Sequence, residues 1–412
     1  MKIAVICHYF YPEIGAPSAR LFEMAKRWVD HGHEVSVITC FPNHPTGRIP
    51  SEYRGKSFMV EIVEGIKIYR NYVYATPNEG FVKKTLGHLS FMVSSVVLSM
   101  FRIEKPDIVI VSSPTLFSVV SGYLYSVFKK TPYIFEVRDL WPDAIVKLGI
   151  LKSRGIIRVL ESLEMFLYHR SKKVVVVTRA FKDQIAMRGI PESKIDIVTN
   201  GVDMEIFNKR LNLKDASLRK EFGWGNKKIF LYVGAHGISQ GLSTLIHVAK
   251  RIENVKDFLI VFVGEGSEKK KLQLMADELA LSNIQFISSQ PKERIPAFYA
   301  EAELSFVPLR NLQMFKSYIP SKMFEILGSG CPIIASLSGE AEEILRNSKG
   351  AIIVEPENVD EIVDATLAIL EDPMLRENLS ENGYNFVKEY YSREALAQKY
   401  LTIIEDLHGG VI

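Results

Sequence analysis

A lysine and a glutamate three residues apart, Lys322 and Glu325, are the strongest candidates for chemistry in this sequence. They follow Ile319, Pro320 and Ser321, and Pro and Ser are typical of a helix start, with Ser as the cap. Unpaired N–H groups and the positive end of the helix dipole favour an anion there, so a first-turn lysine is unfavourable unless an external anion offsets it. The spacing indicates a diphosphate-type site beside a carboxylate that can accept hydrogen bonds from a diol. The alternative is an ordinary ion pair at i,i+3 on a helix surface.

A second candidate lies in the first half of the chain, where Arg138 and Asp139 directly follow the apolar run Pro132–Val137. The carboxyl ends of parallel strands are where a doubly wound fold places its chemistry. A structural salt bridge at the sheet edge is the alternative. The neighbouring Trp141 and Pro142 are typical of a shaped pocket wall, so the sequence favours a functional pair.

Two glycine-containing loops each lie between a predicted strand and a predicted helix. The first holds Gly15 and follows the strand Lys2–Cys7; its single glycine also fits a plain turn. The second, Gly234–Leu242, follows the strand Ile229–Val233, and its four small or flexible positions outline an anion-cradling loop. No G-x-G-x-x-G motif is present, which argues against a dinucleotide cofactor.

The elements that must position these residues alternate between apolar strands and helices along the whole chain, which predicts doubly wound α/β domains. A chain of 412 residues is too long for one compact core. We therefore expect a first domain over residues 1–200 and a second over 201–389. The polar segment Leu211–Lys228 is the predicted crossing, and a C-terminal helix at about 390–412 is predicted to pack back on the first domain.

The composition excludes several classes of protein. Hydrophobic residues make up 47% and charged residues 24%, as in globular proteins, and the net charge of +3 is too small to indicate nucleic-acid binding. Cys7, Cys40 and Cys331 show neither metal-ligand spacing nor a disulfide framework, which is typical of a reducing cytoplasm. The apolar start of the chain is too short for a signal peptide.

The segment Phe81–Phe101 is predicted to be a strongly apolar helix, with two lysines near its start and with Arg102 and Lys105 behind it. Its uncharged part, Leu89–Phe101, is shorter than the roughly 20 residues that cross a bilayer. Two interpretations stay open. One is a core helix, and the other is a helix in the membrane interface whose basic ends meet anionic head groups.

Five pieces of the sequence match a known pattern: Y-P-E-I-G-A-P-S-A-R, N-G-V-D-x-x-x-F (Asn200 to Phe207), Y-V-G-A-H-G-I-S-Q-G-L, V-G-E-G-S-E-K-K-K-L and P-S-K-M-F-E-I-L-G-S-G-C-P-I-I-A. Through them most of the chain resembles the large retaining glycosyltransferase family of the family-four type. That family has the GT-B architecture, an α/β fold of two Rossmann-like doubly wound domains that face each other across a cleft. The R-D-L-W-P element, with S-S-P-T before it, is similar to a subgroup that builds bacterial surface polysaccharides (lipopolysaccharide and capsule) and transfers N-acetylated amino sugars.

The resemblance implies transfer of a sugar, an N-acetylated hexosamine or a related one, from a UDP-sugar donor. The acceptor would be lipid-linked or a saccharide, and the enzyme would act in the cytoplasm, with contact to the inner face of the plasma membrane as an option. No cofactor and no nucleic acid are expected. No D-x-D-type carboxylate pair stands out to hold a metal, so the predicted site is metal-independent.

The chain departs from the family pattern at three places. The first of two customary Glu residues is Ser317, whereas Glu325 matches the second, which in the family binds the ribose. The customary Arg and Lys of the glycine loop are replaced, with His236 nearby and Gln240 at the Lys position. The customary first-domain His is replaced by Asp139.

The predicted catalytic residues are Asp139, Lys322 and Arg138. The remaining predicted residues bind substrate, and they are Gly15, Ala16, His236, Gly237, Gln240, Ser317, Tyr318, Ile319, Pro320, Ser321 and Glu325.

In the predicted mechanism Lys322 neutralises the leaving diphosphate, and backbone N–H groups at Gly15, Gly237 and Ser321 add dipoles. The leaving phosphate takes the acceptor proton on the front face, and Asp139 orients the sugar or the acceptor. The competing interpretations are a nucleotide-sugar epimerase of the same architecture and a non-catalytic scaffold that binds sugar nucleotides or lipids. The sequence leaves the sugar, the nucleotide, the acceptor, the linkage and the oligomeric state undefined.

Overall fold

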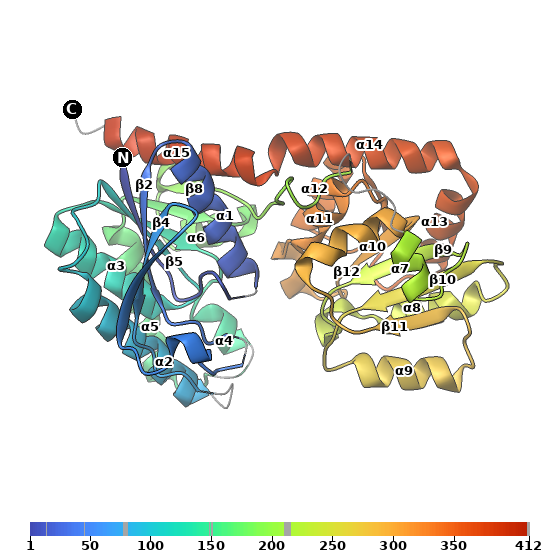
Figure 1. The fold of residues 1–412 in the computed structure, drawn as a ribbon, viewed down its shortest axis with the longest axis horizontal. Coiled ribbons are helices and arrows are strands. Elements are labelled where there is room, and N and C mark those ends of the chain that lie inside the picture. The colour runs from blue at the N-terminus through green and yellow to red at the C-terminus, as the bar shows by residue number, and fades with distance from the viewer. Residues whose placement is uncertain are drawn as a thin grey trace. The chain divides into compact units, whose positions relative to one another are not determined.

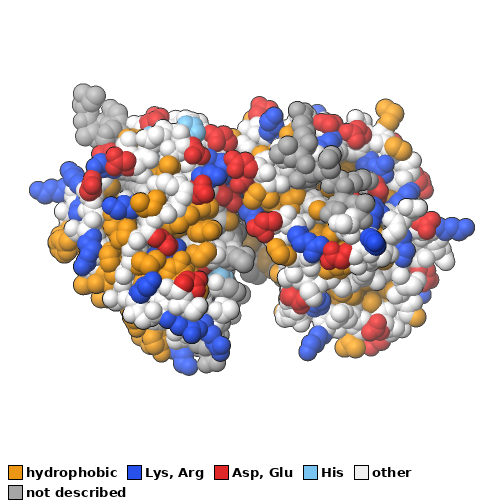
Figure 2. Space-filling view, in the orientation of Figure 1, with side chains coloured by type: hydrophobic (Ala, Val, Ile, Leu, Met, Phe, Trp, Pro, Cys, Tyr) orange, Lys and Arg blue, Asp and Glu red, His pale blue; other side chains and the backbone are white. Residues whose placement is uncertain are grey.

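The chain forms two compact units in the computed structural model, which describes residues 1–13, 15–44, 46–76, 81–147, 149, 151–209 and 216–409 (Figure 1). The first unit comprises Met1–Thr199 with Leu396–Ile412, and the second comprises Asn200–Ala395. The division falls at Asn200, so the polar segment Leu211–Lys228 is not the crossing between domains. It lies within the second unit and contains helix α7 (Ala216–Glu221). Figure 2 shows charged side chains of both signs interspersed over the visible face of each unit, in line with the small net charge.

The first unit is built on a sheet with the strand order β3-β4-β2-β1-β5-β6-β7-β8. All neighbouring strands pair in parallel except β3 and β4, which form an antiparallel edge. The order changes direction at β1, because the chain continues to β2 on one side and returns to β5 on the other. The strands are β1 Lys2–Ile6, β2 Glu34–Cys40, β3 Phe58–Val63, β4 Ile66–Asn71, β5 Ile108–Ser112, β6 Tyr133–Val137, β7 Lys173–Val176 and β8 Ile195–Ile197.

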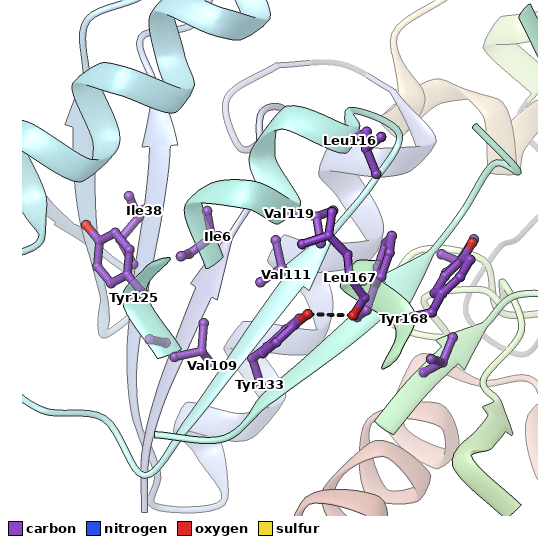
Figure 3. Packing of buried hydrophobic residues seen from close by; sticks show 14 of the residues in the cluster. Ile6, Ile38, Val109, Val111, Leu116, Val119, Tyr125, Tyr133, Leu167 and Tyr168 are labelled. Atoms are coloured by element: carbon purple, nitrogen blue, oxygen red, sulfur yellow. Dashed lines mark hydrogen bonds between the residues drawn. The ribbon is translucent and has the colours of Figure 1, made fainter. Parts of the chain in front are cut away.

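Helices cover both faces of this sheet, and each face has its own hydrophobic cluster. On one face α3 and α5 pack against the strands, where the Tyr133 hydroxyl donates to the Leu167 carbonyl over 2.6 Å (Figure 3). On the other face α1 packs beside α15, and Trp28 Nε1 donates to the Ala397 carbonyl over 3.2 Å. The helices are α1 Ala16–Asp30, α2 Phe81–Ser94, α3 Leu116–Lys129, α4 Asp143–Lys147, α5 Arg154–Arg170, α6 Arg179–Met187 and α15 Arg393–Gly409.

A buried ion pair fastens α1 to the centre of the first unit. Arg20 Nε donates to Glu136 Oε1 over 2.9 Å, and both side chains are at most 1% exposed. Arg20 Nη2 also donates to the Val198 carbonyl over 2.8 Å. The guanidinium therefore ties together α1, β6 and the segment that leaves the unit.

The second unit has a fully parallel sheet with the order β11-β10-β9-β12-β13-β14. Its central strands are continuous apolar runs, as expected for strands covered on both faces. The order changes direction between β9 and β12, and ligands of doubly wound sheets bind beyond the carboxyl ends of strands at such a point. The strands are β9 Lys228–Val233, β10 Phe258–Val263, β11 Ile284–Ile287, β12 Leu304–Pro308, β13 Ile333–Ser336 and β14 Ala351–Val354.

Hydrophobic clusters on both faces of the second sheet complete the same doubly wound arrangement. The predicted α/β class with two Rossmann-like domains is therefore confirmed. Besides α7, the helices are α8 Ser243–Arg251, α9 Lys269–Glu278, α10 Ile295–Glu301, α11 Lys322–Gly328, α12 Glu340–Ser348, α13 Val359–Glu371 and α14 Pro373–Tyr390. Among the helices described in either unit, none combines the length and apolar character needed to span a bilayer.

Candidate functional site

Lys322 begins α11, but its ammonium group points into the second unit instead of toward solvent. Its Nζ has no accessible surface and no hydrogen-bond partner in the described part of the chain. The nitrogen lies 4.0 Å from the centre of the Tyr232 ring, at the end of β9. The residue after that strand is Gly234, and a Cβ there would lie 2.6 Å from Lys322 Nζ. The lysine therefore reaches the point where the strand order changes direction.

Burial disfavours the charged form of the Lys322 amine. Burial lowers the pKa of Lys322 from 10.5 to about 7, and the negative charge of Glu325 opposes that decrease. Near neutral pH both the neutral and the charged form of the amine are therefore accessible. An anion brought into contact with it would favour the charged form and raise its pKa again.

Two glycines allow the loops after β9 and β10 to pack backbone against backbone. Gly234 has φ +140° and Gly264 has φ +143°, a region that L side chains rarely adopt. A Cβ on Gly264 would lie 2.0 Å from the Gly234 carbonyl oxygen, which is closer than any side chain can approach. Lys269 closes the same turn, because its Nζ donates to the Gly264 carbonyl over 3.0 Å and to Glu265 Oε1 over 2.8 Å.

The His236 ring does not line an open binding surface. The residue is fully buried, and its ring contacts the aromatic side chains of Tyr232, Phe262 and Phe286. Burial, reinforced by the positive charge of Lys269, lowers its pKa to about 4, so the imidazole is neutral at pH 7. The His236 ring therefore packs under the loop, and a role of this residue in substrate binding stays a prediction.

Two other predicted binding groups of this loop contact each other. Gln240 Oε1 accepts a hydrogen bond from the Gly237 N–H over 3.2 Å. The Gly237 amide is thus engaged, although it was predicted to be available for a diphosphate. The Arg310 N–H donates to the Ser239 carbonyl over 3.0 Å, which joins this loop to the segment after β12.

The segment before α11 differs from the predicted helix cap. Ser321 already has helical backbone angles (φ −57°, ψ −29°), and its side chain makes no capping hydrogen bond. A cap residue normally has extended angles, which direct its hydroxyl toward the first N–H groups. The Pro320 carbonyl accepts from the Met323 N–H over 3.1 Å, and Ile319 packs against the core.

Ser317 and Tyr318 lie just before that segment, where a short 3₁₀ helix, Gln313–Ser317, ends. Ser317 is half-buried, and the exposed Tyr318 ring stands edge-on to Phe315 at 5.7 Å. Burial of Tyr299 raises its pKa, and the negative charge of Glu325 raises it further. The Glu325 carboxylate therefore lies close to the Tyr299 hydroxyl. A diol-binding role for Glu325 stays a prediction.

In the first unit, Arg138 connects its own loop after β6 to the segment after β5 and to the start of α1. Its backbone N–H donates to Ser113 Oγ over 2.9 Å, and its Nη1 donates to the Pro17 carbonyl over 3.1 Å. Gly15 caps α1 with φ 156°, and its carbonyl accepts the first helical hydrogen bond, from Ala19. Ala16 begins that helix, and its side chain lies outside the described part of the structure.

Asp139 follows Arg138 at the end of β6 and remains exposed to solvent. The protein around Asp139 partly shields its carboxylate from water, and this desolvation raises the pKa of Asp139. The positive charge of Arg138 opposes the increase. The carboxylate is therefore available at the carboxyl edge of the first sheet.

The structure also adds residues that the sequence did not single out. Tyr232 was missed because an aromatic residue inside an apolar strand looks like ordinary core. In the first unit, a buried His8 follows β1, its ring centre lies 4.7 Å from that of His88, and burial lowers the pKa of His88 to about 4. The position of His8 directly after a parallel strand was the signal that could have indicated it. No cluster of three His, Cys, Asp or Glu side chains suited to a metal occurs among the residues with described positions.

Comparison with known proteins agrees with the two-unit division. Residues 18–206 match the family model described as Glycosyltransferase Family 4, and residues 214–386 match the one described as Glycosyl transferases group 1. The putative colanic acid biosynthesis glycosyl transferase WcaI of Escherichia coli (strain K12) is 27% identical over 420 residues, which cover 99% of this chain and 100% of that protein.

Solved structures show the same fold at low sequence identity. Anabaena HepE in complex with UDP and glucose has a TM-score of 0.70 at 15% identity, covering 98% of this chain and 100% of that one. WaaG, a glycosyltransferase involved in lipopolysaccharide biosynthesis, has a TM-score of 0.65 at 15% identity, covering 98% and 99%. With its two halves matched in order by two glycosyltransferase models, the chain belongs to the GT-B glycosyltransferases of the group 1, family 4 type.

Proposed function

We propose that this protein is a retaining, metal-independent glycosyltransferase of bacterial surface-polysaccharide biosynthesis. Its donor would be a UDP-sugar, with an N-acetylated hexosamine or a related sugar, and no cofactor would be needed. The similarity to a colanic acid glycosyl transferase supports the pathway class, and the UDP bound in HepE supports the nucleotide. The acceptor would be lipid-linked or a saccharide, reached in the cytoplasm at the inner face of the plasma membrane.

The observation on which the proposal chiefly depends is the buried Lys322 amine, which lies over the Tyr232 ring at the edge of the second sheet and has no hydrogen-bond partner among the described residues. An isolated buried charge is costly, and a group that can be neutral or charged near pH 7 is poised to pair with an incoming anion. The diphosphate of a sugar nucleotide is such an anion. Binding would hold the ammonium in its charged form beside the phosphate that becomes the leaving group.

The proposed step breaks the bond between the anomeric carbon and the diphosphate oxygen and forms a bond from that carbon to the acceptor oxygen. The acceptor hydroxyl gives its proton to the departing phosphate on the same face, which leaves the anomeric configuration unchanged. Lys322 stabilises the negative charge that develops on the leaving UDP. Glu325 would accept hydrogen bonds from the ribose. In the first unit Asp139 would orient the acceptor, and Arg138 would support it.

The test begins with thermal melting of the full-length protein in the presence of a panel of nucleotide sugars, since a ligand that binds the folded state raises the melting temperature. The stabilising donor is then used in a transfer assay with membrane extract. We expect Lys322→Met to lose transfer, whereas the exposed Lys316→Met, on the preceding 3₁₀ helix, should retain it.

Three results would contradict the proposal. They are transfer by Lys322→Met at the wild-type rate, stabilisation by no UDP-sugar, and conversion of UDP-N-acetylglucosamine into a second sugar nucleotide without any acceptor. The last result would identify an epimerase.

A further inference from the structure

The ammonium group of Lys322 lies over the face of an aromatic ring. Its Nζ is 4.0 Å from the centre of the Tyr232 ring. The other Lys and Arg groups that lie over rings in the described part of the chain are 4.8 to 5.9 Å from the ring centres. The face of an aromatic ring carries partial negative charge and attracts a cation, most strongly where water is excluded. Since Lys322 Nζ has no accessible surface, its contact with the ring belongs to the strong class.

The Tyr232 ring is fixed in place by its own hydroxyl. Tyr232 is fully buried at the end of β9, and its hydroxyl donates to the Ala235 carbonyl over 2.7 Å. The ring centre lies 5.8 Å from that of His236 and 6.2 Å from that of Phe262, so aromatic neighbours also confine it. Burial raises the pKa of Tyr232, which keeps the phenol protonated. The amine therefore meets an uncharged ring and not a phenolate.

Gly234 leaves the space that the amine needs over this ring. A Cβ at position 234 would lie 2.6 Å from Lys322 Nζ and 3.2 Å from its Cε. Gly234 also has φ +140°, a backbone angle that L side chains rarely adopt. A side chain at this position would displace the amine from the ring. The end of β9 thus accommodates the lysine in two ways, with a ring beneath it and a glycine beside it.

The other titratable groups around the amine leave it largely dependent on the ring. Glu325, on the same helix, has a negative charge that raises the pKa of the amine. His236, in the loop after β9, is neutral at pH 7. Tyr299 of α10 stays protonated, because burial raises its pKa. In the loop after β10, Lys269 Nζ and Glu265 Oε1 pair with each other at 2.8 Å.

We propose that Tyr232 is a positioning residue of the transfer reaction: its ring holds the Lys322 ammonium, in the charged form, where the donor diphosphate binds. Tyr232 acts through the lysine and does not itself have to touch the donor. Without the ring, a larger share of the amine would be neutral, and a neutral amine offers a phosphate no positive charge. The inference rests on the proposed function for the identity of the anion. The coupling between ring and ammonium is independent of it.

The first test is urea unfolding at about pH 5 and pH 9. Tyr232→Leu removes the ring, whereas Tyr232→Phe keeps it. The buried charge destabilises the fold more when the ring is absent, and this cost is present at low pH and disappears when the folded protein holds a neutral amine. The folding equilibrium constant of the Leu variant, relative to the Phe variant, should therefore be about tenfold lower at pH 5 than at pH 9.

Lys322→Met supplies the matched control for this comparison. In that background the Leu and Phe variants differ only in how well they pack, so the difference in their stability should be the same at both pH values. Tyr232→Met takes the place of Tyr232→Leu if the Leu protein does not fold. A difference between the Leu and Phe variants that is independent of pH while Lys322 is present would overturn the proposal, because Tyr232 would then only fill the core.

The second test is calorimetric binding of UDP at about pH 5 and pH 8. The Leu variant should bind like the Phe variant at pH 5, where both amines are charged, and about tenfold more weakly at pH 8. A terminal phosphate titrates near pH 6, and taking the ratio of the two variants removes that effect. Equal affinities at pH 8, or the same loss at both pH values, would overturn the positioning role. Coupling in urea together with a wild type that binds UDP at neither pH would contradict the proposed function alone.

Discussion

Replacing Lys322 with methionine keeps an unbranched side chain on the Tyr232 ring but removes the buried amine. In the wild type the pKa of this amine falls from 10.5 to about 7 because of its burial, a difference of about 3.5 pH units. At about 1.4 kcal/mol per unit, the cost to folding has a ceiling of about 5 kcal/mol at low pH. We expect roughly half of that as a gain in unfolding free energy, because water and local relaxation reduce such costs.

The gain should depend on pH in a definite direction. The pKa of Lys322 is lower in the folded protein than in the unfolded chain. The buried charge therefore lowers the unfolding free energy of the wild type by the full amount below about pH 7, and this cost fades as the pH rises toward 10.5. The difference in stability between Lys322→Met and wild type should therefore be largest at about pH 6 and small at about pH 10. Urea unfolding followed by circular dichroism at about pH 6, 8 and 10 measures it, with the exposed Lys316→Met as the control.

The same variant should lose function while it gains stability. Turnover should fall by about 10²–10³-fold, the range for removal of one group that stabilises a leaving charge. In the wild type, UDP affinity should decrease as the pH rises above about 7, because an increasing fraction of the amine must take up a proton to bind. Lys322→Met should show no such pH dependence. A variant that is less stable at every pH, or that turns over like the wild type, would refute the reasoning.

Three further substitutions test other parts of the structure. Glu325→Gln should raise the donor KM about tenfold, since a hydrogen bond to a charged group is lost, and an unchanged KM in steady-state kinetics would count against ribose binding. Gly264→Ala should lower the unfolding free energy by about 3 kcal/mol or more in urea titrations, because its Cβ would meet the Gly234 carbonyl oxygen. Arg20→Met should lower it by about 3–5 kcal/mol in the same assay, because Glu136 stays buried without its partner.

Controls for the two stability variants come from the chain itself. Gly155 lies on α5 with open space around it, so Gly155→Ala should not destabilise the protein. A Gly264→Ala protein as stable as wild type would show that the two loops can separate at little cost. Adding Glu136→Gln to Arg20→Met should restore part of the lost unfolding free energy. A double variant as unstable as Arg20→Met alone would contradict the ion-pair argument.

Much of the fold could be predicted because parallel strands covered on both faces are short continuous apolar runs, and these are visible in the sequence. The domain crossing was misplaced because α7 lies inside a polar segment that looked like a linker. The position of Lys322 at a helix start was also predictable from local signals. The direction of its side chain was not, because that depends on Tyr232 and Gly234, which are far away along the chain.

The loop after β9 shows the same limit. Its glycine-rich composition indicated an anion-binding loop, but His236 turns inward because the aromatic side chains of β10 and β11 form a pocket for it. Gln240 accepts a hydrogen bond from the Gly237 amide, and the composition of the loop does not reveal this contact either. Long-range packing and side-chain direction were therefore the parts that residue types and spacing could not supply.

The hydrogen bond from Trp28 to Ala397 means that the first unit is assembled from both ends of the chain (Figure 1). During synthesis, the sheet and α1 leave the ribosome long before α15 exists, so the hydrophobic surface that packs against Leu396 and Tyr400 stays uncovered until α15 has been made. The second unit is contiguous and can finish folding earlier. The first unit therefore completes its packing after the second unit has been made, although most of its residues are made earlier.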